Sequence, residues 1–360
     1  MSYEVAISSA FLSAFTMPII LNFAHKNKLF DSSDARKNHN GNIPRLGGVG
    51  MFFAFATMMF ALILIQPGTV AKELASRASR LWPIGLAGTL MCIIGLLDDI
   101  KSQPAKLKLV IQILAAILVV ASGYRFRGFG FHQNAMQGDL AWLSVIISLG
   151  WIVGVANAIN FIDGVDGLAG SISFASSLAY GIFYYRVGDQ SSSLICLCIA
   201  GVIVGFLLFN LPMPRAKIFM GDSGSLFLGF SLAVMPFLGQ VPGIDSSKAG
   251  LGLIPSITML GLPVLDALRV MGLRISQGKN PMSPDRQHLH HLFFDSNHGA
   301  LRVDITFFLV SAGLALAVLA SSVMPRSLGY MIEFIALGLL LIFFRYGRYV
   351  NIEHSANAER

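Results

Sequence analysis

Two asparagines and two aspartates lie close together at residues 157–170, between apolar runs that are each long enough to cross a bilayer. Asp163 and Asp166 are three positions apart, and each precedes a glycine that lets backbone approach a ligand closely. Either Asp-Gly pair alone would be explained by an ordinary turn. Charged groups at a membrane boundary are costly to desolvate, so two such pairs beside Asn160 indicate a working site.

A pair of adjacent aspartates, Asp98 and Asp99, ends the apolar run 80–97. Acids at a helix C-terminus oppose the helix dipole, so this placement favours a functional role over a plain polar stop. Neighbouring carboxylates suit Mg²⁺, which takes oxygen ligands and keeps several waters. They equally suit a base whose pKa is raised by its neighbour. Lys106 and Lys108 open the next run, and snorkelling to the membrane surface is the ordinary explanation for such lysines.

Asp222 stands between Gly221 and Ser223, just before another apolar run. An aspartate there either caps the helix, which is worth about 1 kcal/mol, or presents a carboxylate and free N–H groups to a metal-bound phosphate. The two roles are compatible. Gly47 and Gly48 also allow two interpretations. Either they begin a helix whose free N–H groups bind an anion, or they simply begin a helix after a solvated basic loop.

Three of the eight histidines fall within four positions, as His288, His290 and His291. Zinc is one interpretation, but no cysteine is near and the spacing is not that of a catalytic zinc motif. Arg286 lies beside them, and arginine next to histidine more often holds phosphates or carboxylates. We therefore favour anion binding over zinc for this cluster.

The composition predicts an all-α polytopic membrane bundle. Hydrophobic residues make up 54% of the 360 residues and charged residues only 12%, whereas soluble domains have roughly 45–50% and about 25%. The first apolar run lacks a basic region and a small-residue cleavage site, so we expect a retained span. At roughly 20 residues per span, eleven transmembrane helices are expected near 3–24, 46–66, 80–97, 106–122, 141–159, 168–185, 191–210, 224–238, 252–270, 303–323 and 327–345.

The distribution of basic residues predicts the orientation. Eleven spans place the termini on opposite sides, and the side with more lysine and arginine faces the cytoplasm. Eighteen of the 26 such residues fall on one side, in the tail and in loops 25–45, 98–108, 160–167, 211–223 and 269–302. The N-terminus is therefore expected outside and the C-terminus in the cytoplasm. The net charge of +7 is mostly this orientation signal and gives no case for nucleic acid.

All the acidic, basic and histidine clusters fall on the loops predicted to face the cytoplasm. Membrane-edge carboxylates, a divalent cation and basic or histidine residues for a diphosphate describe metal-assisted phosphoryl transfer. A nucleotide would come from the cytoplasm, and a lipid acceptor would enter sideways from the surrounding membrane lipids. We expect residues 1–360 to form a single integral membrane transferase domain whose cytoplasmic loops are catalytic.

The chain resembles the superfamily of polyprenyl-phosphate N-acetylhexosamine-1-phosphate transferases. Five motifs in the right order carry the resemblance: PRLGG at 44–48, DDIK at 98–101, NAINFIDGVDG at 157–167, FMGDSGS at 219–225 and PDRQHLHH at 284–291. The last motif looks like that of the branch that makes undecaprenyl-diphospho-N-acetylglucosamine. The peptidoglycan branch, which uses UDP-MurNAc-pentapeptide, generally has a different histidine triplet.

The resemblance implies that UDP-GlcNAc and undecaprenyl phosphate react, with Mg²⁺ or Mn²⁺, to give lipid-linked GlcNAc-1-phosphate and UMP. This step initiates lipid-linked cell-surface glycans of the O-antigen, enterobacterial common antigen or teichoic acid type, at the bacterial inner membrane. By the same resemblance Asp222 is a metal ligand with Asn160 beside it. Asp98 and Asp99 would lie at the reacting phosphates, one of them as a base or a metal-associated acid.

The resemblance also assigns the binding residues. Asp163 and Asp166 would line the nucleotide side as part of the catalytic set, and Phe219 would stack on uracil. The diphosphate and sugar would be held by basic and histidine side chains: Lys108, Arg286, His288 and His290. A loop that varies more within the family adds a weaker set: Lys37, His39 and Arg45.

There are two rival interpretations, one from another phosphotransferase family and one from another class of protein. The stretch 163–170 is similar to part of the CDP-alcohol phosphotransferase motif, but that family expects arginine where Gly170 stands and two further spaced aspartates. A cation- or proton-coupled transporter also holds acids in the membrane, yet its site tends to lie near the midplane. The sequence leaves open whether the donor is another UDP-N-acetylhexosamine or UDP-MurNAc-pentapeptide. It also leaves open whether the reaction takes one step or two, and what the oligomeric state is, with a homodimer as one option.

Overall fold

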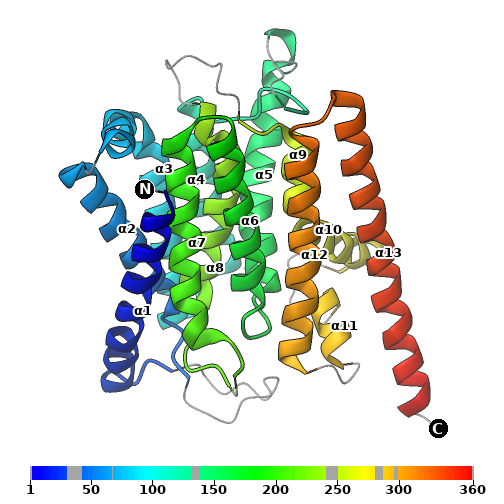
Figure 1. Ribbon diagram of the computed structural model, residues 1–360. Helices are drawn as coiled ribbons and strands as arrows, with labels where there is room; N and C mark the ends of the chain where they lie inside the picture. The colour runs from blue at the N-terminus through cyan, green and yellow to red at the C-terminus, as the bar shows by residue number, and fades with distance from the viewer. Residues whose placement is uncertain are drawn as a thin grey trace.

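The computed structural model describes residues 2–30, 43–66, 68–131, 136, 138–213, 215–240, 250–279, 287–295 and 299–358. The regular elements in this part of the chain are all helices (Figure 1). In chain order they are α1 (Ser2–Lys26), α2 (Gly47–Ile65), α3 (Thr69–Ile100), α4 (Ala105–Ala121), the 3₁₀ turn η1 (Gly138–Leu140), α5 (Ala141–Ile162), α6 (Leu168–Arg186), α7 (Gln190–Asn210), α8 (Gly221–Val234), η2 (Met235–Gln240), α9 (Leu253–Met259), α10 (Gly261–Ser276), α11 (Leu289–Asp295), α12 (Ala300–Ser321) and α13 (Arg326–Ala358).

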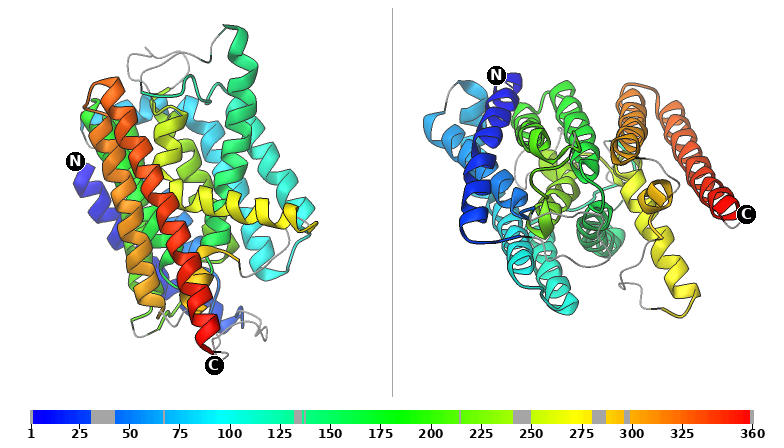
Figure 2. Two further views of the ribbon diagram at one scale, coloured as in Figure 1. Left: turned by 90° about the vertical axis from the view of Figure 1, so that its right-hand side faces the viewer. Right: turned by 90° about the horizontal axis from the view of Figure 1, so that it is seen from below.

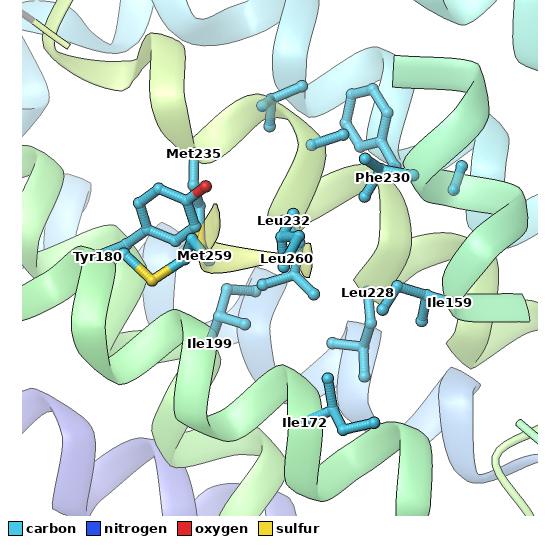
Figure 3. Packing of buried hydrophobic residues seen from close by; sticks show 14 of the residues in the cluster. Ile159, Ile172, Tyr180, Ile199, Leu228, Phe230, Leu232, Met235, Met259 and Leu260 are labelled. Carbon is cyan, nitrogen blue, oxygen red and sulfur yellow. The ribbon is translucent and has the colours of Figure 1, made fainter. Parts of the chain in front are cut away.

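Helix α8 with η2 is the most enclosed apolar segment, and 89% of its apolar window is buried inside the protein. Helices α2, α3, α5 and α6 pack against it. Figure 3 shows Leu228 and Leu232 of α8 among Ile159 of α5 and Ile172 of α6. Because lipid tails are as apolar as these side chains, close van der Waals packing rather than escape from water holds such helices together.

The eleven predicted spans all coincide with helical residues, but fewer of them qualify as membrane-crossing helices. Eight helices in the described part of the chain are long and apolar enough, or nine if the bent pair α9–α10 counts as one span. Helix α4, with 17 residues, and the serine-containing α6 are not among the eight. The protein is a multi-pass helical bundle, while the total of eleven spans remains a prediction.

Two of the expected spans have the wrong limits. The span placed at 80–97 belongs to the longer α3, which begins at Thr69. The span placed at 252–270 is two helices, α9 and α10, which meet at 89°. Leu260 leaves the helical conformation there, and Pro263, which has no N–H to donate, suits the first turn of a new helix. As a result α10 runs across the bundle rather than along it (Figure 2, left).

The polar motifs share one end of the bundle. In Figure 1, α1 and α7 end and α12 begins at the lower end, where α11 also lies. Helix α11 was not expected from the sequence, and it follows directly on the first histidine of the 288–291 cluster. Helix α8, whose first turn carries Asp222, packs against α3 and α5, and these two helices end at the other acidic motifs.

Helix α1 packs on α7 through Gly201, where an added Cβ would collide with the backbone carbonyl of Ala6. We predict that Gly201→Ala lowers the thermal unfolding midpoint in detergent, because backbone cannot yield as a side chain can. Gly313→Ala in α12 is the matched control, since no atom lies within 4 Å of its added Cβ and alanine is the better helix former. An equal midpoint for the two variants would contradict this packing.

Candidate active site

The C-terminus of α3 and the N-terminus of α8 lie unusually close together. A Cβ on Gly95 would collide with the backbone of Asp222, so only glycine permits this approach. Gly221 has a φ of +72°, which favours glycine. A Cβ there would lie 2.6 Å from a carboxylate oxygen of Asp99. The two glycines therefore bring the paired aspartates of α3 against the start of α8.

Asp99 caps α8 from a different helix. Its Oδ1 accepts a hydrogen bond from the backbone N–H of Asp222 at 2.8 Å, and its Oδ2 accepts one from that of Ser223 at 3.0 Å. Two orphan donors of the helix are satisfied by one anion, which the N-terminal dipole also favours. The expectation that Asp222 itself caps the helix is wrong, because Met220 is the N-cap and Asp222 lies in the first turn.

Lys108 connects Asp98 and Asp222. Its Nζ lies 3.2 Å from Oδ2 of Asp98 and 3.0 Å from Oδ2 of Asp222. The backbone N–H of Gln103 donates to Oδ1 of Asp98 at 2.7 Å. Lys108 is thus held between two carboxylates, whereas Lys106, two positions earlier, is exposed as snorkelling predicts.

Two asparagines connect α5 to α8 and to α4, which both pack against α3. Asn160 donates to the hydroxyl of Ser225 in α8 at 2.7 Å. Asn157 donates to Gln112 of α4 at 2.6 Å. Asn160 therefore reaches the same turn of α8 that carries Asp222, three positions before Ser225.

Asp163 is the C-cap of α5 and is partly buried. Burial, followed by the negative charges of Asp222, Asp99 and Asp166, raises the pKa of the Asp163 carboxyl well above its usual range, and the charge of Arg45 opposes this. Asp163 and Arg45 therefore lie within electrostatic reach of one another and of the acids on α3 and α8.

The Gly-Gly start of α2 serves packing. The N–H groups of Gly47 and Gly48 donate to the carbonyls of Phe219 (3.0 Å) and Met220 (2.8 Å), and the N–H of Phe219 donates to the carbonyl of Pro44 (2.8 Å). A phosphate-binding role for these two glycine N–H groups is therefore wrong. The contacts join the 44–48 and 219–225 motifs, and they place Phe219, which is partly buried, at their junction.

The histidine cluster meets the 163–167 loop. His290 is fully buried, and a Cβ on Gly164 would lie 2.7 Å from its Nε2. Burial lowers the pKa of His290 well below its usual range, so the ring is neutral. His288 lies with its ring centroid 5.6 Å from that of Phe161 in α5. The predicted contact of His290 with the diphosphate or the sugar stays a prediction.

No cluster of three or more histidine, cysteine or acidic side chains arranged for one metal ion is found among the described residues. A magnesium site needs fewer carboxylates, because substrate phosphates and water complete its coordination. Asp98, Asp99, Asp163 and Asp222 supply oxygen donors of the right chemistry.

The structure thus brings most of the expected site residues to one end of the bundle. Three of them, Lys37, His39 and Arg286, lie outside the described residues. Sequence reasoning missed Asn210, whose side chain accepts from the N–H of Gly167 and donates to the carbonyl of Ile218, both at 2.9 Å. It also missed Asp266, although an acid within an apolar run is a recognisable signal of a functional group.

The chain is similar to proteins of one known family. Residues 81–240 match the family described as glycosyl transferase family 4. The chain is 32% identical over 277 residues to a probable undecaprenyl-phosphate N-acetylglucosaminyl 1-phosphate transferase of Bacillus subtilis (strain 168), covering 76% of this chain and 72% of that protein. It is 30% identical to the undecaprenyl-phosphate alpha-N-acetylglucosaminyl 1-phosphate transferase of Yersinia pestis (96% and 90% covered) and 28% identical to that of Escherichia coli (strain K12) (95% and 90%).

We predict that Gly221→Ala is more damaging than Gly278→Ala. Both glycines have a positive φ, +72° and +66°, so both substitutions carry a similar backbone cost of roughly 1–2 kcal/mol. Only at position 221 does the new methyl group meet other atoms, the backbone carbonyl of Arg45 and the carboxylate of Asp99. Thermal unfolding in detergent measures both, and equal midpoints would argue against the close contact of α3 with α8.

Proposed function

The chain belongs to glycosyl transferase family 4, and on that premise we propose that it transfers N-acetylglucosamine-1-phosphate from UDP-GlcNAc to undecaprenyl phosphate and releases UMP. The observation that carries the proposal is the meeting of Asp98, Asp99, Lys108 and Asp222 from three separate helices. Together with a divalent cation, such a group of carboxylates and a lysine at a membrane edge suits a reaction between two anionic phosphate substrates.

In this reaction an oxygen of the lipid phosphate attacks the phosphorus that carries the sugar. One P–O bond forms and the P–O bond to UMP breaks, so UMP leaves with the electron pair. The lipid phosphate is already ionised, so the protein mainly has to align the two substrates and reduce their repulsion. Lys108 provides one fixed positive charge between the helix ends, and Arg45 provides a second nearby.

The residues present fit a divalent cation. Asp98, Asp99, Asp163 and Asp222 bring four carboxylates to a region that holds the two cations just named. The raised pKa of Asp163 reflects this excess of negative charge together with burial. We propose that Asp222, with Asn160 on the adjoining helix, holds Mg²⁺ or Mn²⁺. When bound, the ion would screen the charge that develops on the phosphates.

We further propose that this end of the bundle faces the cytoplasm of a bacterial inner membrane and that the 360 residues work as one domain. The excess of basic residues on the loops at this end supports the orientation. The acids lie at helix ends and not at mid-span, which favours a transferase over a transporter. Uptake of labelled substrate into vesicles, compared with UMP release, separates those two classes.

Asp222→Asn should reduce UMP release by about a hundredfold or more, the order seen when one charged or hydrogen-bonding group is removed from a transition state. The variant should still insert and unfold at nearly the wild-type temperature, because Asp222 is in the first turn of α8 but does not cap it. Asp139→Asn, an exposed change in η1, is the control and should keep full activity. Wild-type turnover of Asp222→Asn would remove this residue from the chemistry.

Chelation by EDTA should stop UMP release, because four carboxylates with two cations would repel the incoming phosphates. Adding back Mg²⁺ or Mn²⁺ should restore the rate, whereas the same concentration of a monovalent salt should not. The measurement is initial UMP release by purified protein in detergent with undecaprenyl phosphate. Undiminished turnover in EDTA would exclude an exchangeable cation from the reaction.

A further inference from the structure

Asp266 of α10 is a buried carboxylate, only 2% exposed, that the proposed chemistry does not use. Its Oδ1 accepts from Arg269 Nη2 at 2.7 Å and Nε at 3.2 Å. Its Oδ2 lies 2.9 Å from Nδ1 of His288, and the N–H of Leu289 lies 3.2 and 3.3 Å from the two oxygens. A buried carboxylate is costly unless it is paired, and these contacts satisfy it from three residues.

The same helix also holds the backbone in front of α11. Arg269 donates to the carbonyl of Gln287 at 2.6 Å, so three consecutive residues, 287–289, are fixed on α10. This is possible because the 89° bend after α9 turns α10 across the bundle, toward α5 (Figure 2). The segment that begins the histidine cluster therefore takes its place from Asp266 and Arg269.

The ring of His288 lies between this anchor and the candidate site. It faces Phe161, which is next to Asn160 in α5, at 5.6 Å between ring centroids. It also stacks on His290 at 5.8 Å and 16°, and His290 in turn lies against Gly164. A shift of the His288 ring would therefore change its contact with Phe161, which belongs to the 157–167 motif.

We propose that Asp266 is a positioning residue that fixes the orientation and tautomer of His288 for binding the sugar of the sugar nucleotide. A carboxylate can only accept, so Nδ1 of His288 carries the proton and points into α10. Nε2 then keeps its lone pair and accepts a hydrogen bond from a hydroxyl or amide N–H of the sugar. A histidine oriented through one nitrogen by a carboxylate is a recurrent arrangement wherever the other nitrogen has to meet a ligand. This inference rests on the proposed function for the identity of the substrate.

A double-mutant cycle tests whether Asp266 acts through His288. Asp266→Asn should lower kcat/KM for UDP-GlcNAc about tenfold or more, the range found when the partner of a ligand-binding histidine is removed. The loss should be mainly in KM, because orientation of a binding group is affected. In the His288→Ala background, Asp266→Asn should cost almost nothing further. The same fold loss in both backgrounds would overturn the proposal.

Asp304→Asn provides the matched control for this cycle. Asp304 is also a buried carboxylate, and a Cβ on Gly167, at the end of the same motif, would lie 3.3 Å from it. Its effect should multiply with that of His288→Ala, since it lies at Gly167 and not beside His288. A coupling as strong as that of Asp266 would mean that any buried acid near the loop gives the result.

A second measurement does not depend on turnover. In wild-type protein labelled with ¹⁵N-histidine, the resonances missing from His288→Ala should report a protonated Nδ1 and an unprotonated Nε2. A His288 that is protonated on Nε2 alone would overturn the proposal even in an active enzyme. Failure of the wild type to release UMP, with the Nδ1–H tautomer present, would instead count against the proposed function.

Discussion

The arrangement depends on one interaction, the hydrogen bonds from the first turn of α8 to the carboxylate of Asp99. An aspartate at the end of α3 is unfavourable for its own helix dipole, and the N-terminus of α8 offsets this by offering two donors and a positive dipole end. Asp98 then lies beside Asp222, with Lys108 between them. This contact joins the end of α3 to the start of α8 and so brings the acids of both helices into one site.

The second constraint is electrostatic. Four carboxylates lie within electrostatic reach of one another at the ends of α3, α5 and α8, and Lys108 and Arg45 balance only part of their charge. The divalent cation that we propose would complete the neutralisation and would also screen the charge of the anionic substrates. Small residues such as Gly95 let the ends of α3 and α8 approach closely and bring these charges together. Close packing of this kind holds helices together in lipid, where the hydrophobic effect does not act between them.

Sequence reasoning placed the motifs on one side of the membrane because the clusters coincide with the excess of basic residues. It could not say which groups would touch. The N–H groups of Gly47 and Gly48 were as free to bind phosphate as to bind backbone until the 219–220 segment was seen beside them. The continuous hydrophobicity of residues 252–270 gave no sign of the bend between α9 and α10. The role of Asp266 in that run follows from the structure, in which its carboxylate contacts His288.

The central claim is that this site moves a phosphosugar and not a sugar alone. The most direct measurement uses UDP-GlcNAc with ³²P in the phosphate next to the sugar, together with undecaprenyl phosphate and purified protein. We predict that the label moves into the lipid phase. Label that stays in water as UDP while GlcNAc reaches the lipid would contradict the account, because the nucleotide would then have left with both phosphates.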